Sequence, residues 1–201
     1  DIVYGGDPTE VYDERSEPVP VNTYGRLKAD FDKYLAGRTE PHCIVLRPSN
    51  IVGPVHPYQS TGTKFLQWLD GQLRKDEPTK VFDDEHRNYV WVEDLVDMVM
   101  RLIDSFPTAL PEHKLFICGG PDALTRVDVA WLLAEAKGYP LIYQSPDGAQ
   151  VARLVPTPRA AVDLGYPSPL CIRMCSAQAE EFLGRRFRSL AEALKEDPSR
   201  I

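Results

Sequence analysis

The feature that most constrains the fold is a short apolar run that follows an amphipathic helix. Residues 42–47 read HCIVLR, and turn-forming residues flank them on both sides. Such a continuous run is typical of a strand buried on both faces, as in a parallel sheet. The preceding residues 22–36 have helical periodicity, and residues 1–4 (DIVY) indicate the end of an earlier strand. The order strand, helix, strand predicts a βαβ unit with a right-handed crossover.

The rest of the chain keeps alternating between helices and strands, which predicts an α/β fold. Strands are predicted at 81–82, 88–92 and 114–118, and helices at 63–74, 93–106, 125–138, 176–184 and 189–194. Thr125 and Ser176 are the expected N-caps of their helices, while Gly138 and Gly184 are the expected ends. Residues 140–169, rich in proline and glycine, are the part of the chain whose structure the sequence defines least.

Apolar periodicity also predicts which faces of two helices are buried. In the helix at 22–36, the stripe expected to face the protein consists of Tyr24, Lys28, Phe31 and Leu35. In the helix at 93–106, the expected stripe consists of Leu95, Val96, Val99, Leu102, Ile103 and Phe106. Asp94, at the start of this second helix, is more typical of a favourable charge at a helix N-terminus than of a ligand.

Composition excludes several classes of protein. The net charge is −7 and the basic residues are scattered, so a nucleic acid partner is not expected. No apolar run approaches the ~18 residues of a membrane span. Four cysteines are too few for a disulfide scaffold at this length, which favours a reduced, cytoplasmic protein. Cys171 and Cys175 lack a second pair and a nearby histidine, so no metal site is expected.

Tyr24 and Lys28 lie one helical turn apart and allow two interpretations. They could belong to an ordinary amphipathic helix, with the lysine stem lying along apolar surface. Alternatively, they could form a proton-transfer pair, because a nearby ammonium favours the ionised form of a phenol. The spacing alone does not separate the two interpretations.

Five segments in fixed order carry a resemblance to a known family. They read DIVYGG, NTYGRLK, IVLRPSNIVGP, HRNYVWVEDL and KLFICGGPDALTRVDVAWLL. The chain resembles the extended short-chain dehydrogenase/reductases, and most of all their dTDP-4-dehydrorhamnose reductase-like (RmlD-like) branch. That branch also contains the regulatory subunit of methionine adenosyltransferase. The resemblance is clear over residues 1–140 and weaker to about residue 195.

The resemblance implies a Rossmann-type doubly wound parallel sheet and a small α/β substrate-binding region. Residues 1–55 would be the C-terminal part of the NAD(P)-binding domain, with its catalytic helix. Residues 56–201 would be mainly substrate-binding, with the strand at 114–118 returning to the Rossmann sheet. The family's glycine-rich phosphate-binding turn is absent, and its catalytic serine or threonine would fall just before Asp1. We therefore expect a piece of a longer polypeptide, inactive by itself.

The resemblance also assigns roles around the cofactor, NAD or NADP. Tyr24 would be the catalytic acid/base, and Lys28 would support it and hydrogen-bond the nicotinamide ribose. Both would bind the cofactor together with Pro48 and Ser49, which leave the carboxyl end of a predicted strand, where such sheets bind ligands. An alternative is that residues 48–50 are simply a turn that ends the strand.

Two further residues are implied in substrate binding. Asn50 would lie on the substrate side of the loop, and Arg87 matches an arginine that contacts the substrate diphosphate in many sugar-nucleotide members. A guanidinium suits phosphate because it donates two parallel hydrogen bonds and stays charged. The alternative for Arg87 is a surface ion pair with one of the adjacent acids at 83–85.

Three functional hypotheses follow from the resemblance. The first is an NAD(P)-dependent oxidoreductase acting on a keto group of a nucleotide-linked sugar or similar metabolite. The second is a non-catalytic regulatory subunit like that of methionine adenosyltransferase, and the third is a nucleotide-sugar epimerase or dehydratase. The family also leaves a homodimer open, since helix-pair dimers are common in it.

Overall fold

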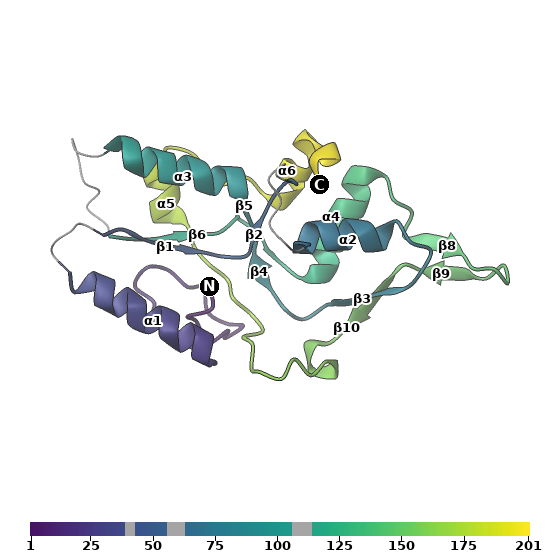
Figure 1. Ribbon diagram of the computed structural model, residues 1–201, viewed down its shortest axis with the longest axis horizontal. Helices are drawn as coiled ribbons and strands as arrows, with labels where there is room; N and C mark the ends of the chain where they lie inside the picture. The colour runs from purple at the N-terminus through teal and green to yellow at the C-terminus, as the bar shows by residue number, and fades with distance from the viewer. Residues whose placement is uncertain (39–42, 56–62, 106–113) are drawn as a thin grey trace.

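The structure is a computed structural model that describes residues 1–38, 43–55, 63–105 and 114–201 (Figure 1). The predicted strand start at His42 and the helix end at Phe106 lie outside these residues. Within the described part of the chain, no helix combines the length and the apolar character needed to cross a bilayer. The two largest groups of elements are a three-layer unit and a helix-rich unit around a second core.

The three-layer unit is built on two parallel strands, β1 (Val45–Pro48) and β6 (Leu115–Cys118). Helix α1 (Thr23–Ala36) covers one face, and α3 (Val92–Ser105) and α5 (Ala177–Leu183) cover the other (Figure 1). Successive β6 side chains point to opposite faces. Ile117 belongs to the cluster that includes Ala29 of α1, whereas Phe116 packs with Met98 of α3. The predicted α/β layering and the strand at 114–118 are confirmed.

The second core lies between α2 (Phe65–Leu73), α4 (Arg126–Lys137) and α6 (Leu190–Glu196). Its fully buried leucines include Leu66, Leu69 and Leu133, and burying each contributes ~1.5–3 kcal/mol. Short strand pairs surround this core. They are β2 (Ile51–Val52) with β5 (Val90–Trp91), β3 (Thr79–Phe82) with β10 (Leu154–Thr157), β4 (Arg87–Asn88) with β7 (Ala123–Leu124), and the hairpin of β8 (Ile142–Gln144) and β9 (Gln150–Ala152).

Local capping explains where α4 begins and ends. The Thr125 hydroxyl accepts from the Asp128 N–H, and the Asp128 carboxylate accepts in return from the Thr125 N–H. Gly138 ends the helix with φ 67°, a conformation that glycine adopts without strain. Ser176 is the N-cap residue of α5, as predicted, but its side chain makes no capping hydrogen bond, because its hydroxyl instead hydrogen-bonds the backbone N–H and C=O of Gly119.

The predicted strand at residues 1–4 is wrong. These residues form a turn, in which the Tyr4 N–H donates to the Asp1 carbonyl at 3.1 Å. Tyr4 itself is fully buried, and its ring stacks on Tyr12 with centroids 4.4 Å apart. The apolar residues are therefore buried by side-chain packing, without a ladder of strand hydrogen bonds.

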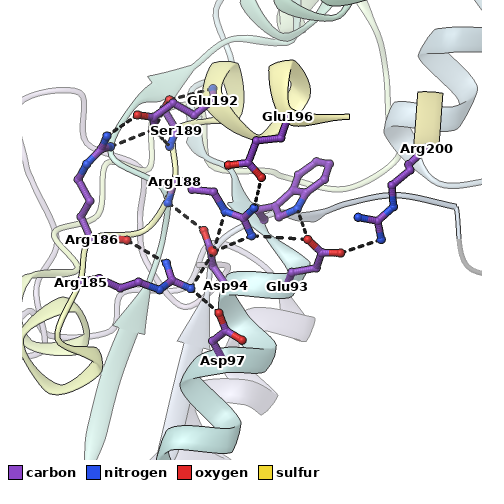
Figure 2. Close-up of polar contacts among 11 residues, drawn as sticks. Glu93, Asp94, Asp97, Arg185, Arg186, Arg188, Ser189, Glu192, Glu196 and Arg200 are labelled. Atoms are coloured by element: carbon purple, nitrogen blue, oxygen red, sulfur yellow. Dashed lines mark hydrogen bonds and ion pairs between the residues drawn. The ribbon is translucent and has the colours of Figure 1, made fainter. Parts of the chain in front are cut away.

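The predicted buried face of α3 is wrong in part: Leu102 is buried and Leu95 packs against the same cluster, as predicted, but the rest of the stripe within the described residues is exposed. Asp94, Met98 and Leu102 are buried, whereas Val96 and Ile103 are 52% and 57% exposed. The reason is electrostatic, because the Asp94 carboxylate turns inward to meet two arginines from the segment between α5 and α6 (Figure 2). An ionised carboxylate is buried only with such partners.

Asp94 is held by four contacts. One carboxylate oxygen accepts from Arg185 Nη2 at 3.0 Å and from both Nε and Nη2 of Arg188 at 2.9 Å. The other oxygen accepts from the Arg188 backbone N–H at 2.8 Å. Glu93 adds bonds to Arg200 and to the indole of Trp91 (Figure 2). This network fixes the C-terminal segment to the start of α3.

We expect Asp94→Asn to lower the free energy of unfolding by about 2–3 kcal/mol, because it leaves two arginines without their buried partner. Urea denaturation measures the change. Asp97→Asn is the matched control: Asp97 pairs with the same Arg185 but is 58% exposed, so its loss should cost about 1 kcal/mol or less. Equal losses for the two variants would contradict this account.

A second charged cluster ties α2 to α4. The Asp70 carboxylate accepts from Lys137 Nζ at 2.7 Å and from the Tyr139 hydroxyl at 2.8 Å, and it pairs with Arg74 at 2.8 Å. Burial opposes ionisation of Asp70, but the hydrogen bonds from Lys137 and Tyr139 outweigh it, so its pKa is lowered.

This shift gives a signed dependence of stability on pH. A carboxyl whose pKa is lower in the folded state adds stability that is complete above its unfolded pKa of about 3.9 and is lost as pH falls through the folded value. We expect Asp70→Asn to be less stable than the wild type at pH 7, and the difference to shrink between about pH 5 and pH 2. Urea midpoints across that range measure it; a difference independent of pH would contradict the assignment.

Candidate active site

Helix α1 presents small residues inward and its predicted site residues outward. Gly25 and Ala29 are buried, and a Cβ on Gly25 would lie 2.4 Å from the Ile2 carbonyl oxygen. Tyr24 and Phe31 are 59% and 55% exposed, so the predicted inward stripe is wrong. The backbone at Ile2 packs so closely on α1 that only glycine fits at position 25.

Tyr24 and Lys28 nevertheless border a groove at the carboxyl end of β1. The groove has a volume of about 530 Å³, and its lining includes Tyr24, Lys28, Pro48, Ser49 and Asn50. The Lys28 Nζ lies 5.6 Å from the centroid of the Tyr24 ring. Five of the six predicted site residues therefore share one groove.

Ser49 has an unmet polar group in this groove. The residue is 5% exposed, and its backbone N–H donates to the Cys118 carbonyl at 2.9 Å. Its hydroxyl is buried and has no hydrogen-bond partner among the residues that the structure describes. An unpaired buried hydroxyl costs about 1–3 kcal/mol. A bound group with hydrogen-bonding capacity would recover this energy.

A second cavity, of about 580 Å³, adjoins the N-terminus of α1 and shares Tyr24 and Asn50 with the groove. Its charged lining consists of Asp1, Arg26, Glu85, Arg87 and Arg126. No group of three or more potential metal-ligating side chains occurs within the described residues. The charged groups that line this cavity are guanidinium and carboxylate groups.

Arg87, the sixth predicted site residue, lines this second cavity but is 5% exposed. Its carboxylate partners are Asp1 at 3.3 Å and Glu85 at 3.4 Å. Burial lowers the pKa of Arg87, against the opposing attraction of Glu85. The ion pair with Glu85 that was one alternative does form, but in the interior of the protein and not on its surface.

Sequence reasoning missed a partly buried arginine in the lining of the groove, Arg47. Arg47 Nε donates to Asp32 at 2.8 Å, and its Nη1 donates to the Tyr4 hydroxyl at 3.0 Å. Asp32 lies one helical turn beyond Lys28, and that spacing is the signal that could have been used. The contact ties the middle of α1 to β1, so it helps to hold Lys28 beside the strand end.

Sequence reasoning also missed the segment 165–168, which lines the second cavity. Asn22 joins it to α1: its Oδ1 accepts from the Gly25 N–H at 2.8 Å, and its Nδ2 donates to the Pro167 carbonyl at 3.0 Å. One side chain therefore caps the helix that carries Tyr24 and anchors the wall of the cavity.

We expect Asn22→Ala to lower the free energy of unfolding by about 1–2 kcal/mol, because both bonds are lost. Asn22→Ser is the matched variant, since serine caps helices as well as asparagine does but cannot reach Pro167. Its loss should be about 0.5–1 kcal/mol, measured by urea denaturation. If serine proved as damaging as alanine, the cap would not be the main contribution.

Rossmann-type proteins share this arrangement, a parallel α/β unit with a groove at the end of a strand. Solved structures of similar fold support the assignment. The dTDP-4-dehydrorhamnose reductase of Bacillus anthracis, solved in complex with NADP, matches with a TM-score of 0.74 at 17% identity, covering 97% of this chain and 61% of that one. The UDP-glucose 4-epimerase of Thermus thermophilus, solved with NAD, matches with a TM-score of 0.70 at 19% identity, covering 96% and 58%. These likenesses confirm the Rossmann-type fold.

Residues 1–198 match the family described as the RmlD substrate binding domain, so the chain belongs to that family. Among curated proteins, the ADP-L-glycero-D-manno-heptose-6-epimerase of Brachyspira hyodysenteriae is 24% identical over 142 residues. That match covers 66% of this chain and 43% of the epimerase. The chain therefore spans about half the length of the relatives that it matches.

Proposed function

We propose that the full-length protein is an NAD(P)-dependent oxidoreductase that reduces a keto group of a nucleotide-linked sugar. The observation that carries the proposal is the groove that Tyr24 and Lys28 share with residues 48–50 at the carboxyl end of β1. Open α/β sheets bind their ligands at such strand ends. Family membership and NADP in a reductase of similar fold support the cofactor class. In this proposal, residues 1–55 belong to the dinucleotide-binding domain and residues 56–201 mainly to the substrate-binding region.

The residues of the groove fit a nicotinamide cofactor. The unpaired Ser49 hydroxyl supplies a hydrogen-bonding group for its nicotinamide end, next to Pro48. Lys28 supplies ammonium donors for ribose hydroxyls. When bound, the reduced cofactor supplies the hydride that the carbonyl carbon accepts.

Proton transfer then falls to Tyr24. Its hydroxyl donates a proton to the substrate oxygen as the carbonyl becomes an alcohol. The ammonium of Lys28 lies on the same side of α1, 5.6 Å from the centroid of the Tyr24 ring, so it places a positive charge beside the residue that donates the proton. Asn50 lines both the groove and the adjoining cavity, where it would contact the substrate.

An epimerase is the second candidate, because the curated relative and one of the similar structures are epimerases. The same tyrosine and lysine would then serve a reaction with no net oxidation or reduction. Absorbance of reduced nicotinamide during turnover separates the two. A reductase consumes the reduced cofactor in proportion to product, whereas an epimerase leaves its total unchanged.

We expect Tyr24→Phe in the full-length protein to lower turnover by about 10²- to 10⁴-fold, because it removes the general acid. Cofactor affinity, measured by fluorescence titration, should stay within about twofold, since the ring remains. Tyr34→Phe is the matched control: Tyr34 lies on the same helix, is 57% exposed, and borders neither the groove nor the cavity. Undiminished turnover in Tyr24→Phe would rule out the assigned role.

A further inference from the structure

All four Nη donors of Arg87 are hydrogen-bonded within the protein, and its Nε faces a carboxylate. A guanidinium has five N–H donors. Nη1 of Arg87 donates to the carbonyls of His86 and Leu170 at 2.7 and 3.1 Å. Nη2 donates to the Pro169 carbonyl at 2.6 Å and to Glu85 at 3.4 Å, while Nε faces Asp1 at 3.3 Å. Arg87 therefore fixes the backbone at residues 169–170 and holds Glu85 and Asp1.

Arg126 lines the same cavity but is more exposed than Arg87 and makes fewer hydrogen bonds. Its side chain is 35% exposed, and its Nε donates to the second carboxylate oxygen of Glu85 at 3.1 Å. Its Nη groups have no hydrogen-bond partner within the described residues. The guanidinium carbon lies 5.0 Å from the ring centroid of Phe65 and 5.2 Å from that of Phe82. The Glu85 carboxylate and the two rings thus hold the Arg126 guanidinium in place while leaving its Nη groups available to a ligand.

Further features of the cavity favour an anion. Its lining holds three guanidinium groups and two carboxylates, from Arg26, Arg87, Arg126, Asp1 and Glu85. Asn22, Thr23 and Tyr24, at the N-terminus of the 14-residue helix α1, also line it. The first N–H groups of a helix lack partners within the helix and attract negative charge.

We propose that Arg126, and not Arg87, binds the diphosphate of the substrate. This inference rests on the proposed function for its substrate class, and it concerns which guanidinium meets the phosphate oxygens. Two free Nη groups allow paired hydrogen bonds to one phosphate, the geometry in which arginine binds most strongly. Because Glu85 and the two rings already restrict the side chain, little further rotamer entropy is lost on binding.

The test is calorimetric titration of the full-length protein with thymidine diphosphate, uridine diphosphate and inorganic pyrophosphate. For each of these ligands that the wild type binds, we expect Arg126→Gln to weaken the affinity by about 10- to 100-fold, because charge-assisted hydrogen bonds are lost. Arg126→Lys should recover part of that affinity, because it restores the charge without the fork. The matched control is Arg101→Gln. Arg101 is an exposed arginine of α3 whose guanidinium lies 5.9 Å from the ring centroid of Phe182, and it does not line the cavity. This variant should bind the ligands as tightly as the wild type does.

The outcomes separate the inference from the proposed function. Unchanged affinity in a folded Arg126→Gln overturns the inference and leaves the proposed function standing. Loss of affinity in that variant, with no turnover of any nucleotide-linked sugar by the wild type, supports the inference and overturns the proposed function. If the wild type binds none of the three ligands, the inference is overturned, whereas the proposed function is decided by turnover of a nucleotide-linked sugar.

Discussion

The buried carboxylate of Asp94 is the interaction on which most of the architecture depends. It lies in the first turn of α3, is fully buried, and is neutralised by arginines more than 90 residues further along the chain. An unpaired charge in that position would cost several kcal/mol, so the segment that carries Arg185 and Arg188 has to return to α3. The same contact sets the rotation of α3, because it directs one polar position toward the interior.

The rotation of α3 bears on the candidate site through the sheet. With Asp94 inward, Met98 and Leu102 pack with Phe116 of β6 and Phe187 beyond α5. On the opposite face, Ile117 packs with α1. The strand pair β1–β6 is thus held between two layers, which fixes the carboxyl end of β1 beside the exposed side of α1. The groove between them exists because both layers are in place.

Sequence patterns predicted the elements well and their orientation poorly. The capping residues Thr125 and Gly138 act within a few residues of one another, so their roles follow from local sequence. The inward faces of α1 and α3 depend on partners that periodicity does not include: a backbone turn at residues 1–4 and the arginines beyond residue 184. The saturation of Arg87 depends on carbonyls more than 80 residues away, in a region that the sequence left undefined.

Local and global charge act in opposite directions at the second cavity. The whole chain carries −7, which repels anions at long range, but screening limits that repulsion to about 8–10 Å at physiological ionic strength. Inside the cavity, guanidinium groups outnumber carboxylates by three to two. Glu85 contacts both Arg87 and Arg126, so one carboxylate neutralises part of two positive charges. Since Arg87 is sealed by backbone carbonyls, the positive charge of the cavity that a phosphate can reach lies at Arg126 and at the exposed Arg26.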